Sequence, residues 1–164
     1  MRLWRISNHA DLQGIGGLRA AARWHSRGRP IVYLAESPPG ALIEILVHQE
    51  MPSPSALPDT YRLLMIEVDE TVMPLECPPL PPDWSSRQDV TRAVGDDWLA
   101  QGASALLRVP GAIMPDVYNN VLLNPIHPDI AKIRIVEVRD VSFDPRLFKS
   151  IPSDKGVAAV ERST

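Results

Sequence analysis

One acidic residue in an apolar segment is the first feature of this sequence that could do chemistry. Glu44 lies among aliphatic residues in the run ALIEILVH (41–48). A carboxylate in such surroundings needs a partner, a water-filled cleft or a ligand to keep its charge solvated. Upstream lie Tyr33, in an apolar run, and Arg23, in an arginine-rich segment. A guanidinium, an aromatic hydroxyl and a carboxylate within about twenty residues can form a site for an anionic, sugar-containing substrate.

Simpler explanations remain open for these residues. Glu44 and His48 are four positions apart, so both can belong to the polar stripe of a partly exposed helix. Arg23 can equally be one cation of a solvated, arginine-rich surface. Spacing alone does not decide between a site and a surface.

A second polar group lies in the segment 106–129, which contains Asn120 and, in the run NPIHP, Asn124. Asparagine side chains offer both a donor and an acceptor, which suits ribose hydroxyls or a carboxamide. Asparagine before proline also initiates turns well, so turn formation is the alternative role.

Several kinds of site are not supported by the motifs present. The run GIGG (14–17) reads as a flexible loop, because it lacks the third glycine of a dinucleotide fingerprint, and no P-loop motif is present. The four histidines lack metal-ligand spacing, and Cys77 is the only cysteine, so we predict no metal site and no disulfide.

Length and composition predict one globular domain. The chain has 164 residues, 45% of them hydrophobic and 23% charged, which is enough for a sizeable core. We predict a single domain over residues 1–150 and a flexible tail over 151–164. No apolar run is long enough for a membrane span, and the N-terminus has no secretory signal, so we expect a cytoplasmic protein with no membrane partner.

The charge distribution favours a small anionic ligand over nucleic acid. Residues 1–30 carry six arginines against one acidic residue, a balance of +5, so the remainder carries −8 of the total −3. The chain has only three lysines and no basic run interleaved with aromatic residues, so we expect no direct nucleic-acid binding.

These residues must be positioned by a mixed set of elements. We predict helices from about 38 to 50, with Ser37 as N-cap, and over 88–100. The proline-rich segment 74–82 is predicted to be an extended loop. Strands are predicted at 3–7, 31–35, 61–68, 104–109, 120–123 and 132–138. Because strands and helices do not alternate regularly, the fold class is α+β, with mostly antiparallel small sheets and a few helices.

Taken together, these segments resemble the RES-domain family, the toxins of bacterial toxin–antitoxin pairs. The matching segments are LWRIS, then ARWHSRGRPIVYLAESPPGALIEILVH, then GDDWLAQGASALLRVPGAIMPDVYNNVLLNPIHPDIAKIRI. Each is loose by itself, but their order and spacing are specific and cover the chain to about residue 140. The resemblance implies an ADP-ribosyltransferase-like fold that acts on NAD+ as a substrate, with no prosthetic group.

The resemblance also implies roles for particular residues. The family's catalytic arginine, tyrosine and glutamate fall on Arg23, Tyr33 and Glu44. The glutamate would stabilise an oxocarbenium-like state, the arginine would hold a phosphate or ribose, and the tyrosine would stack on nicotinamide or bind ribose. The implied substrate-binding positions are Arg5, Trp24, Ser37, Gly111, Asn120 and Asn124.

One position departs from the family pattern. The family's serine usually follows a Val-Pro dipeptide, and this chain has Gly111 there. Ser104 is nearby in sequence but precedes the motif, so it is not assumed to substitute. The loss of the hydroxyl can weaken the activity, route it through water or leave it intact.

The resemblance therefore predicts a toxin that degrades NAD+ by hydrolysis or phosphorolysis of the nicotinamide–ribose bond. The alternatives are a protein ADP-ribosyltransferase and a catalytically impaired member that only binds its partner. In each case a cognate antitoxin is expected to cover the active site in a hetero-oligomer.

Overall fold

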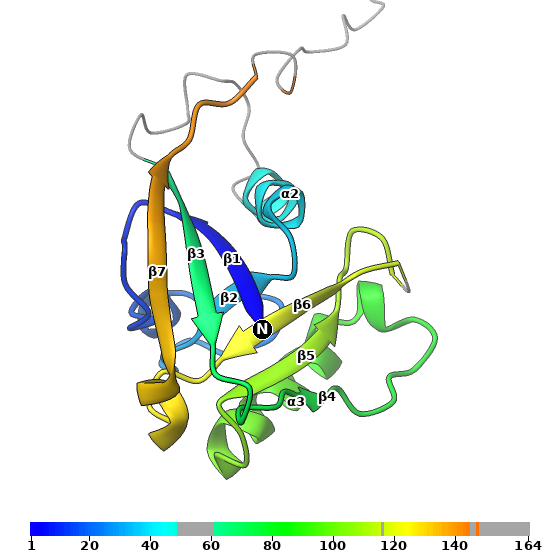
Figure 1. Ribbon diagram of the computed structural model, residues 1–164. Coiled ribbons are helices and arrows are strands. Elements are labelled where there is room, and N and C mark those ends of the chain that lie inside the picture. The colour runs from blue at the N-terminus through cyan, green and yellow to red at the C-terminus, as the bar shows by residue number, and fades with distance from the viewer. Residues whose placement is uncertain (49–60, 116, 145–146, 148–164) are drawn as a thin grey trace, which may run out of the picture.

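A single seven-stranded sheet organises the protein (Figure 1). The computed structural model describes residues 1–48, 61–115, 117–144 and 147, so the predicted tail (151–164) lies outside the described residues. The strand order is β4-β5-β6-β2-β1-β3-β7. Every pairing is antiparallel except that of β4 with β5. The strands are β1 (Arg2–Ser7), β2 (Val32–Ala35), β3 (Arg62–Val68), β4 (Leu75–Glu76), β5 (Leu106–Pro110), β6 (Asn119–Leu123) and β7 (Ile133–Asp140).

Among the described residues, three α-helices and two short 3-10 helices accompany the sheet. They are α1 (Gly16–Arg19), α2 (Pro38–His48), α3 (Gln88–Gln101), η2 (Trp84–Ser86) and η3 (Pro128–Lys132). The Ser37 hydroxyl accepts the backbone N–H of Gly40 at 3.2 Å, as expected of a helix N-cap. No helix in the described part of the chain is both long and apolar enough to cross a membrane.

The predicted α+β class is confirmed, with three differences of detail. The strands join into one sheet, whereas several small sheets were predicted. The run GIGG was predicted to be a loop, but its last two glycines begin α1. Likewise, the predicted proline-rich loop contains β4, whose two residues pair with β5 and leave the prolines outside the ladder.

The two faces of the sheet bury different clusters. One face carries Val32, Leu34, Val121 and Leu123, which belong to the largest apolar cluster. This cluster also contains residues of the strands that flank β2 and β6 within the sheet. Because side chains alternate along a strand, the intervening residues point to the other face. We call this second face, which carries Tyr33, Ala35, Asn120 and Leu122, the helix face.

Both longer helices pack on the helix face, over different strands. Helix α3 contributes Trp98 and Leu99 to a cluster with Leu107 of β5 and Leu122 of β6. Helix α2 contributes Ala41 and, less buried, Leu42 and Ile45 to a cluster with Ile6 of β1 and Ala35 of β2. The helix face is thus divided into two apolar clusters, and polar residues from α2, β2 and β6 can meet between them.

Candidate functional site

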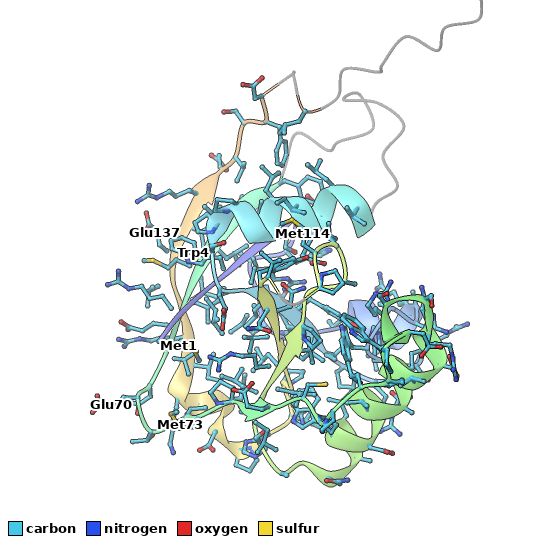
Figure 2. All side chains as sticks on the ribbon, turned by 90° about the vertical axis from the view of Figure 1, so that its right-hand side faces the viewer. Met1, Trp4, Glu70, Met73, Met114 and Glu137 are labelled. Atoms are coloured by element: carbon cyan, nitrogen blue, oxygen red, sulfur yellow. The ribbon has the colours of Figure 1, made fainter. Side chains whose placement is uncertain are left out.

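The Glu44 carboxylate is bound by two side chains that are distant in sequence. The Tyr118 hydroxyl donates to Glu44 Oε1 at 2.6 Å, and Asn120 Nδ2 donates to the same oxygen at 2.8 Å. Tyr118 lies on the same loop between β5 and β6 as Met114, which Figure 2 labels where it overlaps α2 in the view. In the described part of the chain, Oε2 makes no hydrogen bond. Glu44 therefore belongs to a polar cluster with residues outside its own helix, whereas the side chain of His48, its predicted partner in a polar stripe, lies outside the described residues.

Asn120 brings an unused acceptor to this cluster. The residue is 6% exposed, and it lies opposite Ala35 in the pairing of β6 with β2. Its Nδ2 is engaged by Glu44, but its buried Oδ1 has no partner among the described residues. Buried polar atoms are nearly always hydrogen-bonded, so this oxygen is suited to accept a donor from a bound molecule.

Tyr33 lies on the same face, next to this cluster. It pairs with Leu122 across β2 and β6, so its side chain is a diagonal neighbour of Asn120, at about 7–8 Å by sheet geometry. Its hydroxyl accepts the backbone N–H of Trp24 at 3.1 Å and lies 2.9 Å from Nδ1 of His25. Burial raises the pKa of Tyr33 above its ordinary value, so the hydroxyl stays protonated.

Arg23 is held against α3 and η2. Its Nη1 donates to the Ser85 carbonyl at 2.9 Å, and its own carbonyl accepts the Thr91 hydroxyl at 2.7 Å. Arg92 Nε donates to the neighbouring Ala22 carbonyl at 2.8 Å. The guanidinium is half-buried and retains further N–H donors for an anionic group.

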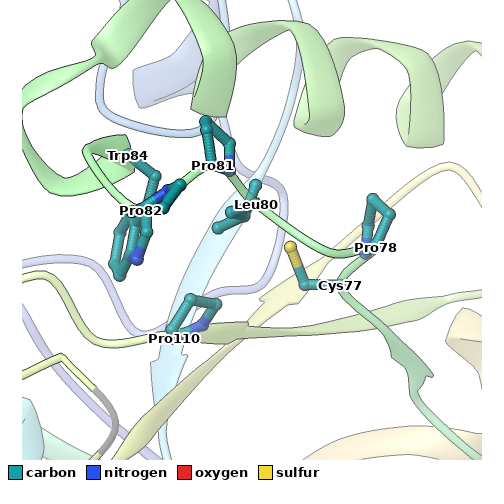
Figure 3. Close-up of a pocket in the computed structure, with 7 residues that line it drawn as sticks. All are labelled: Cys77, Pro78, Leu80, Pro81, Pro82, Trp84 and Pro110. Atoms are coloured by element: carbon teal, nitrogen blue, oxygen red, sulfur yellow. The ribbon is translucent and has the colours of Figure 1, made fainter.

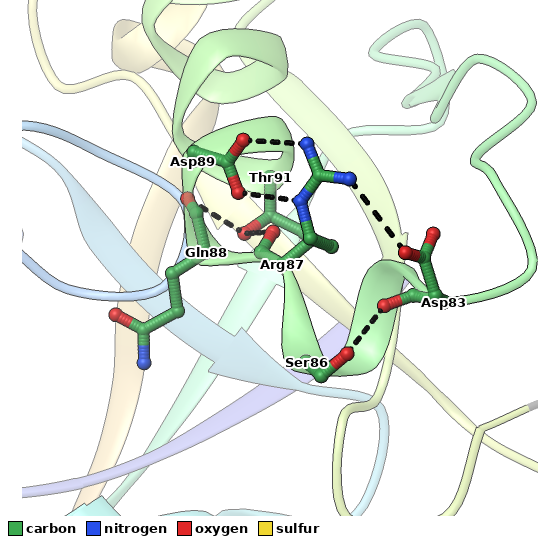
Figure 4. Close-up of polar contacts among 6 residues, drawn as sticks. All are labelled: Asp83, Ser86, Arg87, Gln88, Asp89 and Thr91. Carbon is green, nitrogen blue, oxygen red and sulfur yellow. Dashed lines mark hydrogen bonds and ion pairs between the residues drawn. The ribbon is translucent and has the colours of Figure 1, made fainter.

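The junction between η2 and α3 is fixed by ion pairs (Figure 4). Arg87 donates to both carboxylate oxygens of Asp89, at 3.0 and 2.8 Å, and lies 3.6 Å from Asp83. The hydrogen bond from Arg87 lowers the pKa of Asp89 to about 2. These exposed ion pairs lie next to Ser85, whose carbonyl accepts from Arg23.

Tyr118, which makes the shortest hydrogen bond to Glu44, was not among the residues predicted from the sequence. Its hydroxyl is kept protonated, because burial and the hydrogen bond to Glu44 both raise its pKa. The ring lies against Gly111, the position of the family's serine: a Cβ there would lie 2.2 Å from the ring's Cζ. In the sequence, only the glycine at the family's serine position hinted at an unusual arrangement here. Nothing in the sequence indicated that Tyr118, seven positions later, would lie next to it.

Four predicted binding residues have structural contacts of their own, and their binding roles stay predictions. Arg5 lies on the face opposite the helix face and donates to the Asp11 carbonyl at 2.9 Å. Trp24 is 2% exposed and packs in the cluster under α3. Ser37 caps α2. Asn124 is 1% exposed and accepts the Ile126 N–H at 3.2 Å, which is the turn role left open by the sequence.

A shallow pocket lies beside the junction of η2 and β5 (Figure 3). It is lined by Cys77, Pro78, Leu80, Pro81, Pro82, Trp84 and Pro110. Burial, with a smaller effect of Glu76, raises the pKa of Cys77 to about 11, so its thiol is a poor nucleophile. The pocket adjoins Gly111 through Pro110 and Ser85 through Trp84.

Comparison with known proteins identifies relatives of this chain. A model of the RES domain matches residues 2–145. Toxin Res of Pseudomonas putida is 49% identical over 148 residues, which cover 90% of this chain and 100% of that protein. The Prs ADP-ribosylating toxin of a Sphingobium species is 35% identical over 158 residues, covering 89% and 96%.

A solved structure supports the fold. The Mycobacterium tuberculosis MbcT–MbcA toxin–antitoxin complex contains a chain with a TM-score of 0.67 and 18% identity. The similarity covers 89% of this chain and 85% of that one. At this level of identity, the match bears on the fold.

Proposed function

The chain belongs to the RES-domain family, and from that membership we propose that it is the toxin of a toxin–antitoxin pair and cleaves the nicotinamide–ribose bond of NAD+. The observation that carries the proposal is the Glu44 carboxylate, held through Oε1 by Tyr118 and Asn120, while Oε2 makes no hydrogen bond to any of the described residues. The other two residues of the family pattern are Tyr33 and Arg23. Tyr33 lies on β2, which pairs with the strand that carries Asn120, and its hydroxyl accepts the N–H of Trp24, the residue after Arg23.

The chemistry suits a fixed carboxylate. When the bond between ribose C1′ and the nicotinamide nitrogen breaks, its electron pair goes to the nitrogen, and nicotinamide leaves as a neutral molecule. No general acid is needed, and positive charge develops on the ribose, as in glycoside hydrolysis. Glu44 stabilises that charge and accepts a hydrogen bond from a ribose hydroxyl or from the attacking water. An acceptor oxygen then bonds to C1′ and releases its proton.

The neighbouring residues bind the rest of the substrate. Arg23 has free N–H donors for the pyrophosphate, which is the strongest anionic group of NAD+. The unpartnered Oδ1 of Asn120 accepts from a ribose hydroxyl or from the carboxamide. The half-buried ring of Tyr33 offers a stacking surface, since its hydroxyl is engaged by Trp24 and His25.

Water and phosphate are the acceptors we favour, giving ADP-ribose or its phosphate. Transfer of ADP-ribose to a protein is the second candidate, and the 35% identical relative named as an ADP-ribosylating toxin favours it. We further propose that the protein acts in the cytoplasm and that a cognate antitoxin covers the site in a hetero-oligomer. The similarity to a chain of a toxin–antitoxin complex supports this partner.

Expression in bacteria without a partner tests the proposal. We expect the wild-type chain to deplete cellular NAD+ and arrest growth, and Glu44→Gln, at equal soluble level, to do neither. Glu36→Gln is the matched control, because Glu36 is an exposed glutamate paired with Arg108 at 2.9 Å. NAD+ depletion by Glu44→Gln would contradict the assignment. Arrest with an unchanged NAD+ pool and an ADP-ribosylated protein would favour the second candidate.

A further inference from the structure

Gly111 and Tyr118 occupy one place in the structure. They face each other across the start of the β5–β6 loop, where the Gly111 N–H donates to the Tyr118 carbonyl at 3.0 Å. A Cβ on Gly111 would lie 2.2, 2.4 and 2.6 Å from three atoms of the Tyr118 ring, closer than the 3.0 Å that real Cβ atoms keep. Gly111 is not among the positive-φ glycines of the described residues. Glycine is therefore required here by space and not by backbone conformation.

The atom of the ring that lies nearest to this absent Cβ is Cζ, the carbon that bears the hydroxyl. A serine Oγ is one bond from its Cβ, and the tyrosine hydroxyl oxygen is one bond from Cζ. A serine at position 111 and Tyr118 would thus present a hydroxyl from nearly the same point. The Tyr118 hydroxyl uses that position to donate to Glu44 Oε1 at 2.6 Å.

We propose that Tyr118 is the positioning residue of the Glu44 carboxylate and that its hydroxyl takes the place of a serine hydroxyl at position 111. The inference rests on the proposed cleavage of NAD+. Together with Asn120, Tyr118 saturates one carboxylate oxygen and orients the other toward the substrate. On this account Gly111 is compensated within the chain, and the alternative of an impaired site does not follow from the glycine.

Removing only the hydroxyl tests the positioning role. In Tyr118→Phe the ring still fills the space over Gly111, but Glu44 loses one of its donors. We expect kcat for nicotinamide release from NAD+ to fall about tenfold or more, with KM changed by less than about threefold. A displaced carboxylate stabilises the transition state less well but has little effect on substrate binding. Tyr61→Phe is the matched control, since Tyr61 is buried in the cluster under α2. An unchanged kcat in folded Tyr118→Phe would overturn the role.

A double-mutant cycle tests the shared place. Gly111→Ser in the wild-type chain forces the serine against the ring, so we expect lower activity and a lower melting temperature. Tyr118→Ala loses the hydroxyl and is also impaired. In the double variant the serine has room, and we expect its activity and melting temperature to exceed those of Tyr118→Ala.

The outcomes separate this inference from the proposed function. If the wild-type protein cleaves NAD+ but the effects of the two substitutions are strictly additive, the idea that the two hydroxyls share one position is overturned and the NAD+ assignment stays intact. Absence of nicotinamide release and of ADP-ribose transfer in the wild-type protein would contradict the proposed function, and with it the positioning role. The melting temperatures would then still decide whether the two side chains exclude each other.

Discussion

At the scale of single residues, the site depends on which polar atoms are hydrogen-bonded inside the protein and which stay available to a ligand. Glu44 uses one oxygen for Tyr118 and Asn120, and Tyr33 uses its hydroxyl for Trp24 and His25. These contacts fix the side chains before substrate arrives, which is what transition-state stabilisation requires. Arg23 differs, because within the described part of the chain only one of its guanidinium nitrogens is held, by the Ser85 carbonyl.

The geometry of the Arg23 fork leads to a prediction about binding. Arg23→Lys keeps the positive charge but replaces the planar fork by a point charge, which loses the separate nitrogens that donate to Ser85 and, in our proposal, to a phosphate. We expect KM for NAD+ to rise about tenfold with a smaller effect on kcat. Arg19→Lys, at an exposed position on α1, serves as the control. A wild-type KM in folded Arg23→Lys would show that Arg23 does not bind the substrate.

All three tyrosines of the chain have raised pKa values, which predicts an alkaline titration. Burial is the largest cause for Tyr33, Tyr61 and Tyr118, so the folded protein should show little tyrosinate absorbance near pH 10. Because the pKa is higher in the folded than in the unfolded state, the contribution to stability is complete below about pH 10 and is lost as pH rises further. Absorbance and thermal unfolding against pH measure this. Three tyrosines titrating near pH 10 in the folded protein would contradict the burial.

At the scale of elements, the site depends on how closely α3 approaches the segment that carries Arg23. Gly95 allows this approach, because a Cβ there would lie 1.8 Å from the carbonyl oxygen of Trp24. The packed segment in turn supplies the backbone N–H that Tyr33 accepts. A helix interior normally favours alanine over glycine, so packing and not helix propensity explains Gly95.

Gly95→Ala should therefore destabilise the protein although alanine favours helices. We expect a loss of about 1–3 kcal/mol in the free energy of unfolding, as for overpacked sites, together with reduced turnover. Gly16→Ala is the control, since a Cβ on Gly16 meets no atom within 4 Å. Chemical denaturation of both variants measures the difference. A more stable Gly95→Ala would mean that α3 does not lie against Trp24.

The elements also show what the sequence could and could not predict. Strands β1, β2, β3, β6 and β7 and helices α2 and α3 follow from apolar patterning and caps, which are local signals. The short β4 and the start of α1 were missed, because two paired residues or a glycine-rich turn carry no periodic signal. Tyr118 was missed for a different reason. Its role depends on contacts with Glu44 and Gly111, which only the fold brings together.

At the scale of the whole molecule, the arrangement predicts a reaction that needs no metal. Nicotinamide leaves as a neutral molecule, so the proposed cleavage requires no Lewis acid. We expect a chelator such as EDTA to leave NAD+ turnover unchanged. A loss of activity with EDTA that is reversed by adding a divalent cation would contradict this mechanism.

The central claim is that Glu44 drives cleavage of NAD+, and purified protein tests it most directly. Partner-free protein would be mixed with NAD+, with and without phosphate, and followed by NMR for loss of NAD+ and release of nicotinamide. We predict release by the wild-type chain and by Glu36→Gln, about 100-fold slower release by Glu44→Gln, and a co-product that identifies the acceptor. Equal release by folded Glu44→Gln, or none by the folded wild-type chain in either buffer, would contradict the claim.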